Sequence, residues 1–304
     1  MKTPNIPFVI MIFTLSIFSL QTANAANLYQ SEKTFSSYVD KINGQKALLV
    51  YQDSNEAQIL NLGTQKLSGN IYQMSKECRD NNILNKFVYA HPFLTNSQTT
   101  CYIDEESGQL RFIGKTKAPK DNFSFVYLSM DKDNYYFLLN GRDFPNGSHG
   151  YIQVKAISRD ARFQEIFELI SHVPGLSGAM NKEADSDNIY YTEASGMNSN
   201  KLYTISAANL MSVIKERSIR QFSEVSTIIL KPFRGLSFYL FSNGEELLYF
   251  NNSPYGEYPS YTVNKLTGKR EKASLPKGCK PVGARGSKWL LQCQQKNLLT
   301  MPSL

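Results

Sequence analysis

Residues 185–206 read DSDNIYYTEASGMNSNKLYTIS and carry the clearest structural signal in the chain. A polar turn rich in Asp and Asn leads into the apolar run Ile189, Tyr190 and Tyr191, and a second apolar run follows a Gly/Asn/Ser loop and ends at Ile205. Two short apolar runs separated by turn residues indicate a β-hairpin. The fold can therefore be sought in copies of this unit.

Cruder copies of the hairpin recur along the chain. Their first strands read NGQKALLVY (43–51), NKFVYA (85–90), DKDNYYFLL (131–139), DSDNIYY (185–191), NGEELLYF (243–250) and GSKWLLQC (286–293). Their second strands read AQILNL (57–62), TTCYID (99–104), YIQVKAI (151–157), KLYTIS (201–206), SYTVNKL (260–266) and NLLTM (297–301). A further strand precedes most copies, as in NFSFVYLSM (122–130) and LSFYLFS (236–242). The two strands of each hairpin are therefore the second and third strands of a blade.

The spacing of the copies predicts an all-β fold, a six-bladed β-propeller. Aligned first apolar positions lie 40 to 58 residues apart, and a period of about 40 to 50 residues made of short antiparallel strands is typical of propeller blades. The last copy ends after its third strand, whereas residues 27–36 stand as a surplus strand before the first copy. We expect this N-terminal strand to close the last blade and to remove an open sheet edge. Residues 26–304 would then form a single propeller domain.

Two segments fit a strand and a helix equally well. Apolar residues recur at helical spacing in residues 163–170, behind Ser158 and Asp160, and again in residues 210–217, after Ser206. Each segment could equally be the outer strand of its blade. The sequence leaves both alternatives open.

The repeat in residues 185–206 resembles that of secreted and periplasmic propellers of the TolB-like and related kinds. The resemblance rests on a turn rich in Asp, Asn and Gly, a strand that carries Tyr, and a following strand of KLYTI type. It covers the other copies loosely. It implies a propeller with an envelope or extracellular address.

The N-terminus predicts export. Lys2 supplies a positive charge, residues 8–20 form an apolar run, and Ala23-Asn24-Ala25 has the small-x-small pattern of a signal-peptide cleavage site. The apolar run of 13 residues is shorter than the roughly 20 that a spanning helix needs. We therefore expect residues 1–25 to be a cleaved signal peptide, and the remaining chain to be periplasmic or secreted and not membrane-spanning.

The four cysteines favour disulfide bonds over a metal site. An oxidising compartment and an even number of cysteines favour pairing, and there is no CxxC motif. Cys279 and Cys293 lie symmetrically about Gly286, so they could face each other across an antiparallel pair. Cys78 with Cys101 is the remaining pair, although the predicted first and third strands of a blade would be separated by a middle strand.

The sequence offers little evidence of catalysis, so we lean towards a protein that is not an enzyme and that binds no cofactor or metal. It has three histidines without an H-x-H or H-E-x-x-H motif, and no G-x-S-x-G motif. Residues 131–134 and 185–188 resemble the start of a calcium loop but lack the glycine and terminal Glu of that motif. Turn formation by Asp and Asn explains them better.

The alternative function is that of a carbohydrate-active enzyme, a glycoside hydrolase or lyase. Such an enzyme could gather carboxylates from several blades at the propeller channel, about 5 to 10 Å apart. The candidate acids lie in or beside loops that follow second strands: Asp143, Glu193 and Glu257. Each is also explained as a solvated loop charge.

Two loops that join second to third strands predict a binding surface. Residues 141–150 (GRDFPNGSHG) and 251–260 (NNSPYGEYPS) are long for hairpin loops and rich in aromatic residues, Pro and Gly. Aromatic and Arg side chains dominate binding hot spots. The candidate binding residues are Arg142, Phe144, His149, Met197, Tyr255 and Tyr258. Each could instead pack over its own blade.

The charge of the chain indicates what it could bind. The formal net charge is +7 and the pI about 9.0, which favours anionic partners. Residues 265–288 hold eight basic residues against one acid, a run that could bind an anion but more often marks a solvated blade edge. We expect a monomeric binding or scaffold module for a protein or an anionic envelope component, not for nucleic acid. An inhibitor or immunity-type protein is a specific version of this hypothesis.

Overall fold

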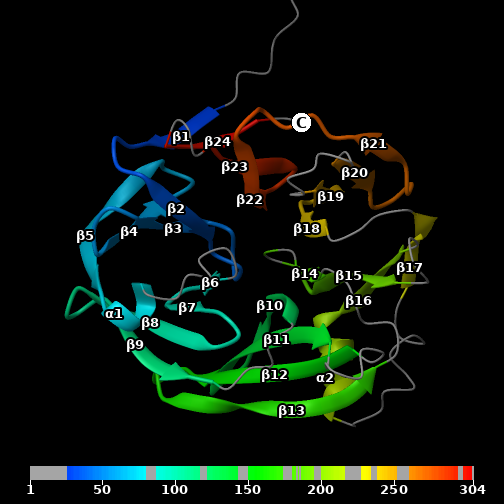
Figure 1. Cartoon of the computed structure of the whole chain (residues 1–304), viewed down its shortest axis with the longest axis horizontal. Coiled ribbons are helices and arrows are strands. Elements are labelled where there is room, and N and C mark those ends of the chain that lie inside the picture. The colour runs from blue at the N-terminus through cyan, green and yellow to red at the C-terminus, as the bar shows by residue number, and fades with distance from the viewer. Residues whose placement is uncertain are drawn as a thin grey trace, which may run out of the picture.

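Hydrogen-bonded sheets arranged in a ring make up the molecule (Figure 1). The structure is a computed structural model of the whole chain. The described residues are 26–79, 87–116, 122–142, 150–173, 180–182, 184, 186–194, 200–215, 227–233, 238–251, 260–293 and 297–302. The predicted signal peptide, residues 1–25, lies outside them.

The first sheet of the ring contains two four-stranded antiparallel halves. One half holds β2 (Phe35–Val39), β3 (Lys46–Tyr51), β4 (Glu56–Asn61) and β5 (Lys66–Met74). The other holds β6 (Val88–Ala90), β7 (Phe93–Thr95), β8 (Thr99–Asp104) and β9 (Gln109–Lys115). The outer strands β5 and β9 join the halves through a short parallel pairing, so that the eight strands count as one sheet. The helix α1 (Lys76–Arg79) follows β5.

Three antiparallel four-stranded sheets come next along the chain. They contain β10 (Asn122–Met130), β11 (Asn134–Arg142), β12 (Gly150–Ser158) and β13 (Phe163–Val173), then β14 (Met180–Lys182), β15 (Asn188–Ala194), β16 (Asn200–Ser206) and β17 (Thr227–Phe233), and finally β18 (Phe238–Ser242), β19 (Glu246–Asn251), β20 (Tyr261–Asn264) and β21 (Arg270–Lys272). The helix α2 (Ala207–Lys215) stands between β16 and β17.

The last sheet combines both ends of the chain. It contains β22 (Cys279–Arg285), β23 (Lys288–Cys293), β24 (Leu298–Met301) and β1 (Ala26–Gln30). Strand β1 pairs antiparallel with β24, from Ala26 opposite Met301 to Gln30 opposite Leu298. The prediction that an N-terminal strand closes the last blade is therefore confirmed, although the predicted strand 27–36 is two strands, since Phe35 begins β2.

The innermost strands form a closed circle of contacts. Each touches the next in the order β2, β6, β10, β14, β18, β22, and β22 touches β2 again. In Figure 1 the other strands of each sheet lie progressively farther from the axis. Radial antiparallel sheets around an axis are the architecture of a β-propeller. The all-β propeller fold predicted from the repeats is thus confirmed.

Burial follows the radial position of each strand. In β3, Ala47 to Tyr51 are all buried, because neighbouring sheets cover both of its faces. In the outer strand β5, residues up to Ile71 are exposed or half-buried and only Tyr72 and Met74 are buried. The apolar runs used to find the repeats are therefore the strands that are buried on both faces.

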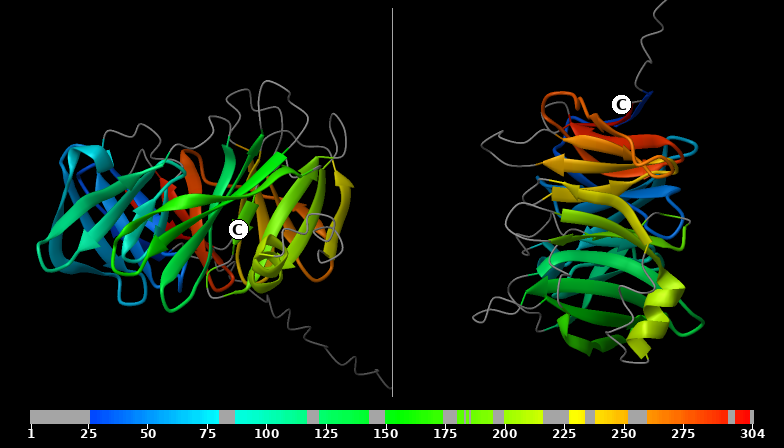
Figure 2. Two further views of the ribbon diagram at one scale, coloured as in Figure 1. Left: turned by 90° about the horizontal axis from the view of Figure 1, so that it is seen from below. Right: turned by 90° about the vertical axis from the view of Figure 1, so that its right-hand side faces the viewer.

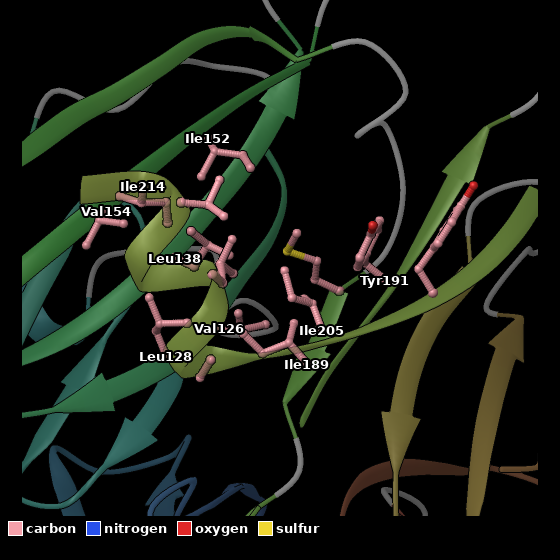
Figure 3. Close-up of a cluster of buried hydrophobic side chains, with 14 residues drawn as sticks. Val126, Leu128, Leu138, Ile152, Val154, Ile189, Tyr191, Ile205 and Ile214 are labelled. Atoms are coloured by element: carbon pink, nitrogen blue, oxygen red, sulfur yellow. The ribbon is translucent and has the colours of Figure 1, made fainter. Parts of the chain in front are cut away.

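One large apolar cluster of the described residues lies between two neighbouring sheets. It joins β10, β11 and β12 to β14, β15 and β16, and α2 adds Leu210, Val213 and Ile214 (Figure 3). Figure 2 shows α2 at one end of the ring, beside these sheets. Burial of its apolar face explains why a helix stands here in an otherwise β-rich chain.

The two ambiguous segments have different structures. Residues 163–173 form the strand β13, which pairs with β12. Residues 207–215 form the helix α2, in which Ser206 Oγ accepts a hydrogen bond from the N–H of Asn209 at 3.0 Å. This bond is an N-cap, which stabilises the start of a helix.

The strand assignment in residues 78–104 is wrong. Residues 88–90 form the innermost strand β6, not a second strand, and the prediction missed β7 at Phe93–Thr95. Cys78 lies on α1, outside the sheet, and is bonded to Cys101 on β8 with a Cα–Cα distance of 6.1 Å. No strand separates the two cysteines, which removes the conflict raised by the sequence.

The second cysteine pair has the predicted geometry. Cys279 and Cys293 are direct partners in the β22–β23 register and form a disulfide with a Cα–Cα distance of 4.0 Å. Gly286, in the turn between these strands, has a φ of 57°, a conformation that glycine adopts without steric strain. This disulfide joins the first two strands of the closing sheet.

Candidate functional site at the ring axis

The turns that follow the innermost strands meet around the axis at one end of the ring, here called the axial end. Lys41 N–H donates to Tyr89 O at 2.9 Å, so the turn after β2 contacts the end of β6. Gly244 N–H donates to Gly286 O at 2.9 Å, which links the turns after β18 and β22. The second strands start at this end and run towards the opposite one.

Residues 40–45 cross the axis at this end. A Cβ placed on Gly44 would lie 3.4 Å from Ala184 Cβ, in the turn after β14. Strands β2 and β14 are three steps apart in either direction around the ring, and Figure 1 shows them on opposite sides of the axis. Residues 40–45 therefore bring groups from opposite sides of the ring together.

Asp40 fixes the conformation of this turn. Its side chain is buried, and Oδ1 accepts hydrogen bonds from the N–H groups of Ile42 and His91, both at 3.2 Å. Its own N–H donates to Lys46 O, and its carbonyl accepts from Gly44 N–H. Burial raises the pKa of Asp40. The hydrogen bonds that its side chain accepts from Ile42 and His91 oppose the rise, as do the nearby charges of His91 and Lys46.

Two lysines approach each other beside this turn, and we call Lys41 and Lys182 the axial pair. Lys182 ends β14, and its Nζ lies 5.2 Å from the centre of the Tyr127 ring on β10. Both lysines are half-buried. The pKa of Lys41 is lowered to about 8, mainly by burial; Asp40 opposes the change, and the charge of Lys182 makes a smaller contribution to the lowering. The two amines thus influence each other electrostatically.

Tyr127 and Tyr89 belong to innermost strands that end near this turn. Burial raises the pKa of Tyr127 to about 12, with smaller contributions from Tyr135 and Asp40, so its hydroxyl stays protonated at neutral pH. Tyr89 is buried, and its hydroxyl lies 2.9 Å from His91 Nδ1.

His91 lies at the edge of the axial end. Its Nε2 is 3.5 Å from Glu105 Oε1, and burial lowers the pKa of the imidazole, with Lys46 adding to the effect and Glu105 and Asp40 opposing it. Within the described ranges, no three His, Cys, Asp or Glu side chains gather as a metal site.

The sequence did not indicate the axial pair. Lys41 and Lys182 are far apart in the chain and neither belongs to a motif. A faint signal was available, because each lysine falls where an innermost strand meets a turn. Using it required the strand assignment and the ring order together.

The side chains of the candidate residues named from the sequence lie outside the described part of the chain. Arg142 is the last residue of β11, and Glu193 on β15 pairs in register with Lys201; the described part of the chain does not include these side chains. The others lie outside the described residues: Asp143, Phe144, His149, Met197, Tyr255, Glu257 and Tyr258. The strands that lead to these residues, β11, β15 and β19, all run away from the axial end. They therefore end on the same side of the ring.

The basic stretch 265–288 uses several of its charges within the fold. Lys265 Nζ donates to Asn243 O, and Arg285 Nη1 donates to Leu62 O at 2.7 Å. Arg270 lies 4.4 Å from the centre of the Tyr261 ring, and Lys269 pairs with Glu271 at 2.6 Å. The blade-edge interpretation fits residues 270–272, which form the outer strand β21, but not residues 279–285, which form the innermost strand β22.

Comparisons with known proteins add a loose likeness of shape. No protein-family profile and no curated protein matches the sequence. A calcium-binding protein, regucalcin, from Agrobacterium tumefaciens superposes with a TM-score of 0.49 at 10% identity over 92% of this chain and 93% of that one. The β-propeller domain of Myceliophteria thermophila Cps50 (Swd1) superposes with a TM-score of 0.48 at 9% identity, over 92% of this chain and 99% of that one.

A putative TolB from Agrobacterium tumefaciens gives a TM-score of 0.44 at 10% identity over 81% of this chain and 82% of that one. The assignment of the fold itself rests on strand pairing and ring order. Across the described ranges, no helix is long and apolar enough to cross a membrane.

Proposed function

We propose that the chain is an exported six-bladed propeller that binds a protein or an anionic envelope component through loops at the end opposite the axial end. The count of six treats each half of the eight-stranded sheet as one blade, since each half has its own innermost strand and antiparallel order. The two disulfides are compatible with an oxidising compartment outside the cytoplasm.

One observation carries the choice of the binding end. Residues 40–45 cross the axis at the axial end and contact turns on both sides of the ring. The strands that lead to Phe144, Met197 and Tyr255 all run to the other end. Loops that a rigid scaffold brings to one end are the usual location of recognition residues. A monomer that inserts these loops into another protein's site is the inhibitor or immunity-type version of the proposal.

The test is crosslinking of the mature chain in its native compartment. We expect a discrete partner whose capture is lost in Phe144→Ala and Tyr255→Ala variants. The matched control is Lys132→Ala, in the turn between β10 and β11 at the axial end, where the side chain is 89% exposed. Equal capture by all variants, or no partner, would contradict recognition through these loops.

An enzyme assay separates binding from the alternative function. The purified chain is incubated with envelope polysaccharides, and new reducing ends are measured. We expect no turnover. Turnover that is lost in Asp143→Asn or Glu257→Gln would contradict the proposed role and indicate a glycoside-cleaving enzyme.

A further inference from the structure

We propose that one half of the axial end is a docking surface for a membrane of anionic phospholipid, with Leu266 as the side chain that enters the lipid headgroup layer. This surface lies at the end opposite the recognition loops, so it is a second interaction surface and does not depend on the proposed function. The inference rests on one exposed leucine, on the basic side chains beside it and on the rigid turns that hold both.

Leu266 is the most exposed large apolar residue among those that the structure describes. It is 93% exposed, against 48% for Ile71 and 47% for Met130. It lies in the turn between β20 and β21, at the axial end. A single exposed leucine is common on protein surfaces, so the argument depends on what holds this residue and on what lies beside it.

The turn that carries Leu266 is fixed by hydrogen bonds. Asn264 Oδ1 accepts from the N–H groups of Leu266 at 3.1 Å and Thr267 at 2.8 Å. Lys265 N–H donates to Glu245 O at 3.0 Å, which joins this turn to the turn after β18. The backbone therefore holds Leu266 outside the core, and little entropy is lost when a partner covers it.

A continuous series of hydrogen-bonded turns leads from Leu266 to the axis. Gly244 N–H donates to Gly286 O at 2.9 Å, which joins the turn after β18 to the turn after β22. Arg285 Nη1 donates to Leu62 O at 2.7 Å, and Leu62 N–H donates to Gln45 O at 2.9 Å in the turn that crosses the axis. Figure 1 shows the strands that carry these turns in neighbouring positions around the ring. The turns therefore form one fixed surface.

Basic side chains follow the same series of turns, and we call them the basic arc: Lys46, Lys66, Lys265, Lys269, Arg285 and Lys288. Lys66 and Lys288 are exposed, and neither forms an ion pair with another described residue. Lys265 and Lys269 flank Leu266 in its own turn. The acids of the described residues beside the arc are fewer: Glu245, Glu246 and Glu271. Positive charge therefore exceeds negative charge around Leu266.

The other half of the axial end has a different charge. Its turns carry acids that pair with neighbouring bases: Asp104 with Arg111 at 3.7 Å, Asp133 with Lys132 at 3.8 Å and Asp160 with Arg162 at 3.1 Å. An anionic surface is therefore attracted to the basic arc and not to the whole end.

The combination of charge and an apolar side chain selects a lipid surface among anionic partners. Basic side chains attract the phosphate groups of phospholipids, and an apolar side chain adds affinity where it can enter the boundary of the acyl chains. An acidic polysaccharide supplies the charges without an apolar interior. Leu266 between Lys265 and Lys269 therefore fits a membrane better than a purely ionic partner.

The experiment measures binding of the mature chain to lipid vesicles by sedimentation. One set of vesicles is phosphatidylcholine alone, and the other has equal parts of phosphatidylcholine and phosphatidylglycerol. We expect affinity at least about tenfold higher for the vesicles with phosphatidylglycerol, and release of the protein by added salt, which screens the attraction. Equal binding to both sets, or binding to neither, would overturn the proposal.

Variants then assign the binding to this surface. Affinity should fall about fivefold or more in Leu266→Ser, Lys66→Glu and Lys288→Glu. The matched controls, Met130→Ser and Lys132→Glu, change exposed residues in the other half of the same end and should bind like the wild type. Thermal melts show that the variants remain folded. Equal losses in the controls and in the arc variants would contradict docking through the arc.

A fluorophore tests whether Leu266 enters the lipid. An environment-sensitive dye attached to Leu266→Cys should shift its emission to the blue on vesicles with phosphatidylglycerol, and the same dye on Met130→Cys should not. If the charge reversals weaken binding but Leu266→Ser does not, and the dye does not shift, the arc binds an anionic macromolecule other than a membrane and the proposal is wrong.

Discussion

Lys155 provides the sharpest test of the packing between two neighbouring sheets. It lies on β12 and is fully buried. Its Nζ donates hydrogen bonds to Thr95 Oγ1 and Asn96 O, both at 3.0 Å, and lies 5.9 Å from the centre of the Phe125 ring. Burial lowers the pKa of Lys155 from 10.5 to about 7 because the charged form loses hydration.

This shift links stability to pH with a definite sign. Between pH 7 and 10.5 the unfolded chain holds a proton on Lys155 more often than the folded chain does. The free energy of unfolding must therefore rise with pH in this window. For folded and unfolded pKa values of about 7 and 10.5, Lys155 contributes an increase of about 2 kcal/mol between pH 7 and 9.

The measurement is urea unfolding at pH 7, 8 and 9 for the wild type, Lys155→Met and Lys132→Met. Met keeps the length of the side chain without a titrating group, and Lys132 is 89% exposed. We expect the increase in the free energy of unfolding between pH 7 and 9 to be about 2 kcal/mol smaller in Lys155→Met than in the wild type. The increase in Lys132→Met should equal that of the wild type. At any single pH the variant also loses the two hydrogen bonds, so the slope is the quantity to compare. A slope as steep in Lys155→Met as in the wild type would refute the reasoning.

Two further predictions concern ring closure. Replacing Cys279 and Cys293 by Ser should lower the free energy of unfolding by about 3 kcal/mol, measured by urea unfolding without reductant; an unchanged midpoint would show that this disulfide adds no stability. Gln292→Leu should cost about 3 kcal/mol, because Gln292 Oε1 accepts from Ser37 N and Oγ, both at 3.0 Å, and its Nε2 donates to Phe35 O. A cost below about 1 kcal/mol would mean that these groups find other partners.

The hairpins could be read from sequence because their information is local. In residues 185–206 a polar turn and two apolar runs fix the strands β15 and β16 without reference to the rest of the chain. The helix α2 also has a local signal in its N-cap, Ser206. The strand β13 has no such signal, since pairing with β12 decides its structure.

The sequence failed where a strand was short or its turn unusual. Strands β6 and β7 have three residues each and are joined by His91 and Pro92, without the Gly or Asn that usually marks a hairpin turn. Cys78 resembled a strand residue because it follows β5 closely, yet it belongs to α1. The disulfide with Cys101 was the evidence that the assignment needed correction.

The axial pair shows why ring order decides which residues meet at the axis of a propeller. Lys41 and Lys182 approach each other because β2 and β14 are separated by the same number of innermost strands in both directions. One sheet more or fewer would rotate β14 away from the turn that carries Lys41. Gly44 would then lose its neighbour Ala184, and Lys41 would face another strand.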